Sequence, residues 1–256
     1  MFSLPDNQLS GVLARHIHQL LTDAVPAAES PDATRERLKT RFPPAAARRM
    51  TQLGMSVSAI LDELAPSNAG FQTCSSHVPG DAIIYATQYG EARALETFLD
   101  SFPAASPTGF QTSIHPGAVQ QGMIRRARPV AEFFPMAGAD YLPGQSLLAA
   151  MLSPAPRVIL CGGEECGTWL APIDGASARS FAYGMILARD PPPDAPATPT
   201  AGHITLMPAL AGAPAEKMSH AAWFDILHAR KNFSGVIVPG WRVEVAFAAS
   251  KCPDSI

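Results

Sequence analysis

Apolar and polar positions in the first 64 residues recur at helical spacing. They predict an amphipathic helix over residues 7–25, with one face formed by Leu9, Val12, Leu13, His16, Ile17, Leu20 and Leu21. A short charged helix is predicted next, with Ser30 as its N-cap, and Pro43-Pro44 ends it. A second long helix is predicted over residues 45–64.

The central part of the chain predicts a strand, a helix and a loop. Ala82–Ala86 (AIIYA) is apolar throughout and has the length of a buried strand. Gly90 follows, and a helical pattern then runs to Leu99. Residues 106–116 are polar and are expected to form a loop. This order of elements is typical of an α/β protein that presents a loop at the edge of its sheet.

The second half of the chain predicts short strands and two helices. Strands are expected at residues 130–134, 157–161, 180–188, 204–207 and 241–248, and helices at residues 144–152 and 219–230. His220 and His228 flank the second helix and are expected at its surface or cap. Proline, alanine and threonine dominate residues 190–202, which therefore predict a linker.

Composition and charge exclude several classes of protein. The chain of 256 residues is 47% hydrophobic and 16% charged, which is typical of a globular protein. A net charge of −3 argues against a general nucleic-acid binder. No apolar run approaches the roughly 20 residues of a membrane span, and the N-terminus lacks a signal pattern. We expect a cytoplasmic protein without nucleic-acid or membrane partners.

The four cysteines are too few and too scattered for a disulfide framework. Cys161 and Cys166 frame the segment CGGEEC, but no second pair accompanies them, as a zinc site would require. Cys74 and His77 are the only local cysteine–histidine pair, and a thiolate–base couple is one interpretation of them. The other interpretation is a plain serine-rich loop. We expect no metal and no cofactor.

Five motifs occur in the order in which one known family has them. They are Arg48-Arg49-Met50, Ala86–Glu91 (ATQYGE), Ser106–Phe110 (SPTGF) with Ser113-Ile114-His115, Arg157–Glu165 (RVILCGGEE) and Ala182–Ala188 (AYGMILA). Together they resemble the N-terminal half of the β-ketoacyl synthases, and above all the short ketosynthase-like proteins of aryl-polyene and related polyketide pathways. The resemblance implies a thiolase-like half-fold of the α/β class, a mixed sheet with helices on both faces, plus an extra C-terminal segment.

The resemblance also implies a single ketosynthase-like domain over residues 1–256. Its core covers about residues 45–190, followed by the proline-rich linker over residues 191–202 and a C-terminal extension over residues 203–256 that packs on the core. The family loop is matched by Ser106, Pro107, Phe110, Ser113 and His115. His115 corresponds to a histidine that is not catalytic in the family, and Pro116 follows it where the family has asparagine.

The nucleophile of condensing enzymes is missing from its expected place. In the family a cysteine lies at a strand-to-helix elbow, where the helix N-terminus lowers its pKa. The elbow is expected here at Gly138, Ala139 and Asp140, and Gly138 takes the place of the cysteine. The histidines and lysine that assist decarboxylation belong to the C-terminal half of full synthases, before which this chain ends. Condensation by this chain alone is therefore not expected.

The first functional hypothesis is a non-condensing accessory protein, similar to a chain length factor, in polyketide or fatty-acid-type biosynthesis. It would bind a ketosynthase, an acyl carrier protein or both. Arg125, Arg126 and Arg128 form the densest basic cluster and are the candidate contact for an acidic carrier, with a solvated arginine face as the alternative. Two other hypotheses stay open: a thioester hydrolase or acyltransferase using Cys74 or Cys166, and a homodimeric scaffold.

A half-fold raises a question of burial. In the thiolase architecture two related halves share a layer of helices, so a lone half leaves its inner helix apolar on one side. The predicted N-terminal helix and residues 204–248 are expected to cover that face within the chain. A ketosynthase partner that covers it is the alternative.

Overall fold

A mixed sheet forms the centre of the molecule. The computed structural model describes residues 11–26, 28–64, 80–114, 117–126, 130–190 and 200–248. Within these residues the sheet has eight strands in the order β3-β2-β4-β5-β1-β6-β8-β7. In chain order they are β1 (Leu13–Ala24), β2 (Ala82–Thr87), β3 (Glu132–Ala137), β4 (Arg157–Glu164), β5 (Phe181–Ala188), β6 (Gly202–Pro208), β7 (Phe233–Val238) and β8 (Trp241–Phe247). Strand β2 is parallel to β3 and β4, and the other pairs are antiparallel.

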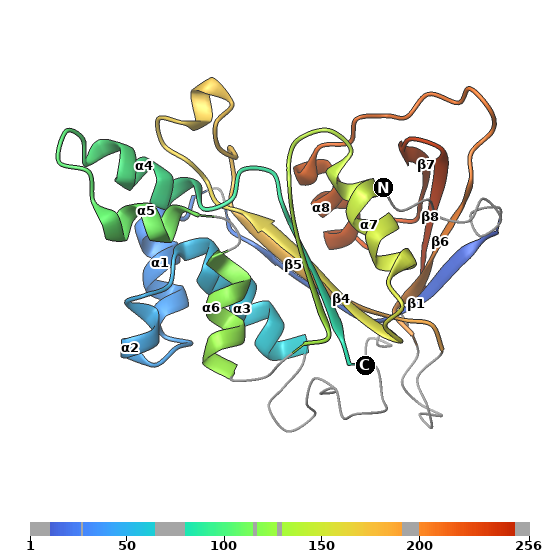
Figure 1. Cartoon of the computed structure of the whole chain (residues 1–256), viewed down its shortest axis with the longest axis horizontal. Helices are drawn as coiled ribbons and strands as arrows, with labels where there is room; N and C mark the ends of the chain where they lie inside the picture. The colour runs from blue at the N-terminus through green and yellow to red at the C-terminus, as the bar shows by residue number, and fades with distance from the viewer. Residues whose placement is uncertain are drawn as a thin grey trace, which may run out of the picture.

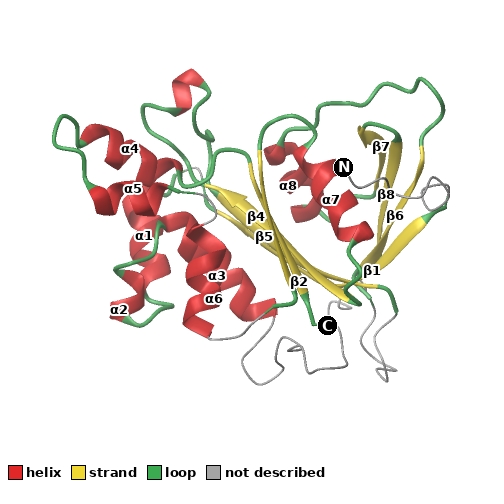
Figure 2. Ribbon diagram, viewed as in Figure 1, coloured by secondary structure: helices red, strands yellow, loops and turns green. Residues whose placement is uncertain are grey.

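Helices cover both faces of this sheet, as Figures 1 and 2 show. In chain order they are α1 (Pro31–Lys39), α2 (Pro44–Ala47), α3 (Gln52–Leu64), α4 (Ala92–Asp100), α5 (Pro107–Ser113), α6 (Gly117–Arg126), α7 (Leu142–Leu152) and α8 (His220–His228), with a short 3₁₀ helix at Ala171–Ile173. Helices α3 and α6 pack on one face, and α7 and α8 pack on the other. The predicted α/β fold with helices on both faces is confirmed.

The N-terminal helix predicted over residues 7–25 is wrong, because its described part is the strand β1. This strand lies between β5 and β6 and pairs with both. A register shift between Ile17 and Gln19 moves the alternation by one residue, so that Ile17 and Leu20 are both buried although three positions apart. The bulge gives the sequence a spacing that resembles a helix.

Two further predictions need correction. The long helix predicted over residues 45–64 is divided into α2 and α3, because the Thr51 hydroxyl accepts a hydrogen bond from the Gly54 N–H and starts a new helix. The loop predicted over residues 106–116 contains helix α5, whose N-cap Ser106 accepts a hydrogen bond from the Gly109 N–H at 3.0 Å. Strand β7 was not predicted at all, and residues 191–199 of the predicted linker lie outside the described residues.

The sheet curves so that β7 packs against α7, and α8 lies beside α7 on the same face of the sheet (Figure 1). The contact is close at Gly144 in the first turn of α7, where an added Cβ would lie 2.3 Å from the Ile237 carbonyl oxygen and 2.7 Å from Val238 Cβ. Trp223 and Phe224 of α8 are fully buried in the same core. One side of α7 is thus covered by β7, and β1 lies within the sheet rather than over a helix face as predicted. Among the described residues, no helix has both the length and the hydropathy needed to cross a membrane.

Candidate functional site

The segment predicted to correspond to the nucleophile elbow of condensing enzymes connects β3 to α7. Gly138, Ala139 and Asp140 lie in this connection, and Tyr141 is the N-cap of α7 in the left-handed conformation, with φ 60°. Gly138 has φ 137°, and no atom lies within 4 Å of the place where its Cβ would be. The Asp140 carboxylate forms an exposed ion pair with Lys217 Nζ at 2.9 Å. The elbow therefore carries no thiol and no aliphatic hydroxyl. Its equivalence to the cysteine elbow of condensing enzymes stays a prediction.

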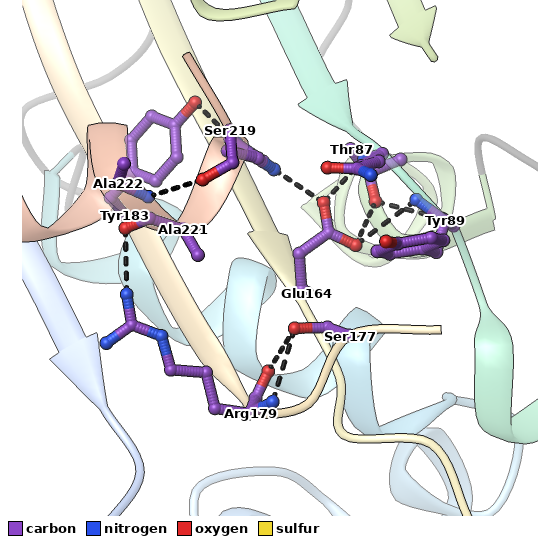
Figure 3. A network of polar contacts seen from close by, with 12 residues as sticks. Thr87, Tyr89, Glu164, Ser177, Arg179, Tyr183, Ser219, Ala221 and Ala222 are labelled. Atoms are coloured by element: carbon purple, nitrogen blue, oxygen red, sulfur yellow. Dashed lines mark hydrogen bonds and ion pairs between the residues drawn. The ribbon is translucent and has the colours of Figure 1, made fainter. Parts of the chain in front are cut away.

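A buried polar network lies beside this elbow, at the carboxyl ends of β2 and β4 (Figure 3). Thr87, the last residue of β2, is paired in register with Ala137, which directly precedes Gly138. The Thr87 hydroxyl donates to Glu164 Oε2 at 3.1 Å, and the backbone N–H of Tyr89 donates to the same oxygen at 3.2 Å. The end of β2 and the turn that follows it are thereby held by one carboxylate at the end of β4.

His220 completes the network from the C-terminal part of the chain. Its Nδ1 lies 2.5 Å from Glu164 Oε1, and its Nε2 lies 3.0 Å from the Tyr183 hydroxyl. His220 is 1% exposed, so its predicted place at the surface or cap of the helix is wrong. His228 is exposed, and its Nδ1 lies 3.0 Å from the Thr22 hydroxyl. Both ring nitrogens of His220 have partners within the protein, so the network fastens α8 to the sheet and leaves no free base.

Arg179 adds a second link between α8 and the sheet. Its guanidinium donates to the Ala221 carbonyl at 2.8 Å, forms an ion pair with Asp225 at 2.8 Å, and lies over the rings of Phe181 and Phe224. Figure 3 shows this side chain reaching from its loop to the helix. The N-terminus of α8 is therefore held at two places.

Three more buried carboxylates surround the N-termini of α3 and α4. Glu165 accepts from the backbone N–H groups of Leu53 at 3.1 Å and Arg93 at 2.7 Å, so that one carboxylate caps both helices. Glu96 accepts from two N–H groups of the β4–β5 loop, at 2.6 and 3.1 Å. Glu91 is buried beside Thr51 and Ala118, but neither of its carboxylate oxygens makes a well-formed hydrogen bond.

Burial changes the proton affinity of two of these groups. It raises the pKa of Glu91 to about 8, with the negative charge of Glu165 adding to the effect. Burial also raises the pKa of Glu165 to about 7, although the N–H groups of Arg93 and Leu53 oppose this rise. The N-termini of α3 and α4 thus converge on a carboxyl pair that cannot readily hold two negative charges.

The residues of the family loop lie mainly on α5. Ser106 is its N-cap, Pro107 is its first residue, and the Ser113 hydroxyl donates to the Phe110 carbonyl at 2.8 Å. The Phe110 ring is half exposed and contacts the Phe98 ring, with centroids 5.5 Å apart. His115 lies outside the described residues.

The basic clusters differ from the one that the sequence predicts. Arg125 and Arg126 are the last residues of α6, but their side chains and all of Arg128 lie outside the described set. A second basic cluster lies elsewhere, around a cavity of about 320 Å³ between α1, α4, α5 and the segment before α3. Its arginines are Arg35, Arg48, Arg49 and Arg93, and we call it the arginine pocket. In the sequence, Arg48-Arg49 is recognisable only as part of a family motif, and the cluster as a whole is not predicted.

Two free cysteines, Cys161 and Cys166, lie among the described residues. Cys161 is buried in β4, as predicted, and burial raises its pKa to about 12. The Cys166 thiol donates to the carbonyl oxygens of Gly167 and Ala178, each at 3.4 Å. Cys74 and His77 lie outside the described residues. In the described ranges, no group of three histidine, cysteine or carboxylate side chains is placed to hold a metal ion.

The structure is similar to solved ketosynthase structures. One of them is the ketosynthase ApeO in complex with its chain length factor ApeC from Xenorhabdus doucetiae; the similarity has a TM-score of 0.57 at 17% identity and covers 91% of this chain and 99% of the matched chain. The chain has the thiolase-like fold of ketosynthases. No protein-family model and no curated protein matches its sequence.

Other ketosynthase-like structures are less similar. The ishigamide ketosynthase/chain length factor has a TM-score of 0.49 at 12% identity, over 69% of this chain and 54% of the matched chain. A 3-oxoacyl-(acyl-carrier protein) synthase from Burkholderia xenovorans has a TM-score of 0.37 at 12% identity, over 86% of this chain and 62% of the matched chain. At 17% identity, the similarity to the Xenorhabdus doucetiae complex is a similarity of fold.

Proposed function

We propose that this ketosynthase-like chain is a non-condensing accessory subunit of a polyketide or fatty-acid-type pathway, and that it pairs with a ketosynthase. Two observations support the first half of the proposal. The connection between β3 and α7, which we expect to correspond to the cysteine elbow of condensing enzymes, contains Gly138, Ala139 and Asp140 and no thiol. The His220 ring next to it is fully engaged by Glu164 and Tyr183. Condensation would then depend on the partner's nucleophile.

The observation that carries the second half is the uncovered edge of the sheet at β3. Among the described residues β3 pairs only with β2, so its outer row of backbone groups faces away from the sheet. Phe134 on this strand is 45% exposed. The strand ends just before the candidate elbow. An open strand with an exposed aromatic side chain is a template for pairing with another chain.

The opposite edge of the sheet and one side of α7 are better covered among the described residues. At the opposite edge, the Val236 carbonyl of β7 accepts from the Glu216 N–H at 2.7 Å, so the preceding segment protects that strand. One side of α7 is packed against β7. A partner is therefore expected at β3 rather than on α7. The matched ketosynthase–chain length factor complex agrees with pairing of this kind, and we propose that the chain helps to set acyl-chain length in such a pair.

An acyl carrier protein is the second proposed partner. Arg125 and Arg126 of the predicted contact are the last residues of α6, which precedes the open strand β3 in the sequence. Opposite charges at such a contact mainly raise the rate of association. Charge reversal at Arg125 should therefore slow binding of a holo-carrier protein while the ketosynthase complex still forms.

Co-expression with ketosynthases from the same gene neighbourhood tests the proposal. Size-exclusion chromatography with light scattering should show a stable one-to-one complex, and the purified chain alone should not condense acyl and malonyl thioesters. A homodimer that persists beside an unbound ketosynthase would contradict the pairing and favour the scaffold hypothesis. An acylated cysteine, detected by mass spectrometry after incubation with acyl thioesters, would instead favour the hydrolase or acyltransferase hypothesis.

A further inference from the structure

The arginine pocket concentrates positive charge in a chain that is acidic overall. Arg35, Arg48, Arg49 and Arg93 line one cavity, whereas the whole chain has a net charge of −3. Asp32 is the one acidic side chain among the lining residues. Like charges held around one cavity repel each other and lower stability, so an anion that binds among them would relieve this repulsion.

Two of the four guanidinium groups are held by bonds within the protein, and the other two belong to exposed side chains. Arg35 donates to the Met50 carbonyl at 3.3 Å, and Arg93 forms an ion pair with Glu96 at 3.4 Å. Arg48 and Arg49 are exposed, and within the described parts of the chain their guanidinium groups have no hydrogen-bond or ion-pair partner. The pocket thus combines positioned donors with unoccupied ones.

The chemistry of the lining indicates the class of anion. Arginine forks bind phosphate oxygens in pairs, and the hydroxyl groups of Thr97 and Thr112 provide further donors at the same cavity. The N-terminus of α3 adds little direct binding, because Leu53 N–H already donates to Glu165 and Gly54 N–H to Thr51. An anion would therefore be held by side chains rather than by backbone groups.

We propose that the arginine pocket binds a small molecule with more than one phosphate group, of the class to which coenzyme A and its thioesters belong. The diphosphate and 3′-phosphate of such a molecule carry several negative charges. These match Arg35, Arg48 and Arg49, which face one aspartate across the cavity, whereas Arg93 is already paired with Glu96. The phosphodiester that links a prosthetic arm to a carrier protein has a single negative charge and matches less well. The choice of a thioester cofactor rests on the proposed function, whereas the binding of a polyphosphate does not.

The concave shape also favours a small ligand. A cavity of about 320 Å³ is at the lower end of the size range for small-molecule sites, and it is large enough for the phosphate groups of a nucleotide. The lining comes from α1, α4, α5 and the segment before α3, so the ligand would bridge elements that also meet at Glu165. Occupancy should therefore stabilise the fold.

Isothermal titration of the full chain with coenzyme A, pyrophosphate and inorganic phosphate tests this proposal. We expect saturable binding of coenzyme A and pyrophosphate, weaker binding of phosphate, and a loss of affinity as salt is added. Arg48→Glu should weaken pyrophosphate binding by about tenfold or more. The control Arg242→Glu, which makes the same charge change on β8, should alter it by less than about twofold.

Three results would overturn the proposal. One is the absence of saturable binding of coenzyme A and pyrophosphate at low salt. Another is an equal loss of affinity in Arg48→Glu and Arg242→Glu, which would indicate general charge attraction. The third is binding of a holo-carrier protein that depends on Arg48 without any binding of coenzyme A. Formation of the ketosynthase complex is measured separately, so a failure here is distinct from a failure of the proposed function.

Discussion

The Oε1 atom of Glu164 lies 2.5 Å from Nδ1 of His220, and this contact joins residues 56 positions apart. Glu164 ends β4 in the middle of the chain, and His220 begins α8 in its C-terminal part. Both side chains are almost completely buried. The contact fastens α8 to the sheet. Glu164 also binds Thr87, which is paired with Ala137 directly before Gly138.

Replacement of His220 tests this role. His220→Gln should lower the free energy of unfolding by about 3 kcal/mol, because Glu164 loses its histidine partner while it stays buried. Urea unfolding followed by circular dichroism measures the change. The matched control is His203→Gln, since His203 is an exposed histidine on β6. Equal stability of the two variants would show that the contact does not fasten the extension.

The buried pair of Glu91 and Glu165 predicts an unusual dependence of stability on pH. The pKa values of about 8 and about 7 lie above the ordinary value of 4.5, so the folded protein keeps protons that the unfolded chain releases. The contribution of these groups to stability is complete below about pH 4.5 and is lost as the pH rises to about 8. Glu91→Gln removes one source of this loss.

We therefore expect Glu91→Gln to be more stable than the wild type at alkaline pH, by about 1 kcal/mol or more, with a smaller difference in mild acid. Urea unfolding at several pH values measures the difference in stability in alkali and in mild acid. The exposed Glu216→Gln variant serves as the control and should follow the wild type throughout. A difference that is the same at all pH values would contradict the assignment.

Gly144 provides a test of the packing between α7 and β7. Alanine usually stabilises a helix relative to glycine, but here its Cβ would lie 2.3 Å from the Ile237 carbonyl oxygen. Gly144→Ala should therefore destabilise the protein by about 2 kcal/mol. Gly11→Ala, whose Cβ would meet no atom within 4 Å, should leave stability unchanged in the same thermal or urea unfolding experiment. A stabilised Gly144→Ala variant would mean that the extension does not press on α7.

The arginine pocket predicts a gain of stability on losing a charge. Arg48→Glu removes one of four like charges and places a carboxylate near the other three, so we expect about 0.5 kcal/mol of stabilisation without ligand. This corresponds to a rise of roughly 1–2 °C in the melting temperature. Arg242→Glu should not be stabilised, because Arg242 already forms an ion pair with Glu244. A lower melting temperature for Arg48→Glu would show that Arg48 has a structural role.

Much of the fold could be predicted from the sequence because many elements have local signals. The buried strand beginning at Ala82, the strand beginning at Arg157 and the N-cap at Ser30 all lie where the pattern places them. Each signal depends on a few neighbouring residues.

The errors arise where distant contacts decide the structure. Strand β1 has a helix-like spacing because its bulge brings Ile17 and Leu20 to the same side, and only pairing with β5 and β6 reveals this. His220 looks like an ordinary first residue of a helix, since its partner Glu164 belongs to a different part of the chain. The doublet of Glu164 and Glu165 at the end of an apolar strand was the available signal, because buried carboxylates require donors.

The most direct test of the central proposal is a charged substitution on the open edge strand. Phe134→Glu should abolish the one-to-one complex with the ketosynthase in size-exclusion chromatography with light scattering, because Phe134 lies on β3 and is 45% exposed. The matched control Leu210→Glu changes a side chain that is 87% exposed outside β3, and its complex should form as in the wild type. A Phe134→Glu variant that is folded and still binds the ketosynthase would contradict pairing through β3.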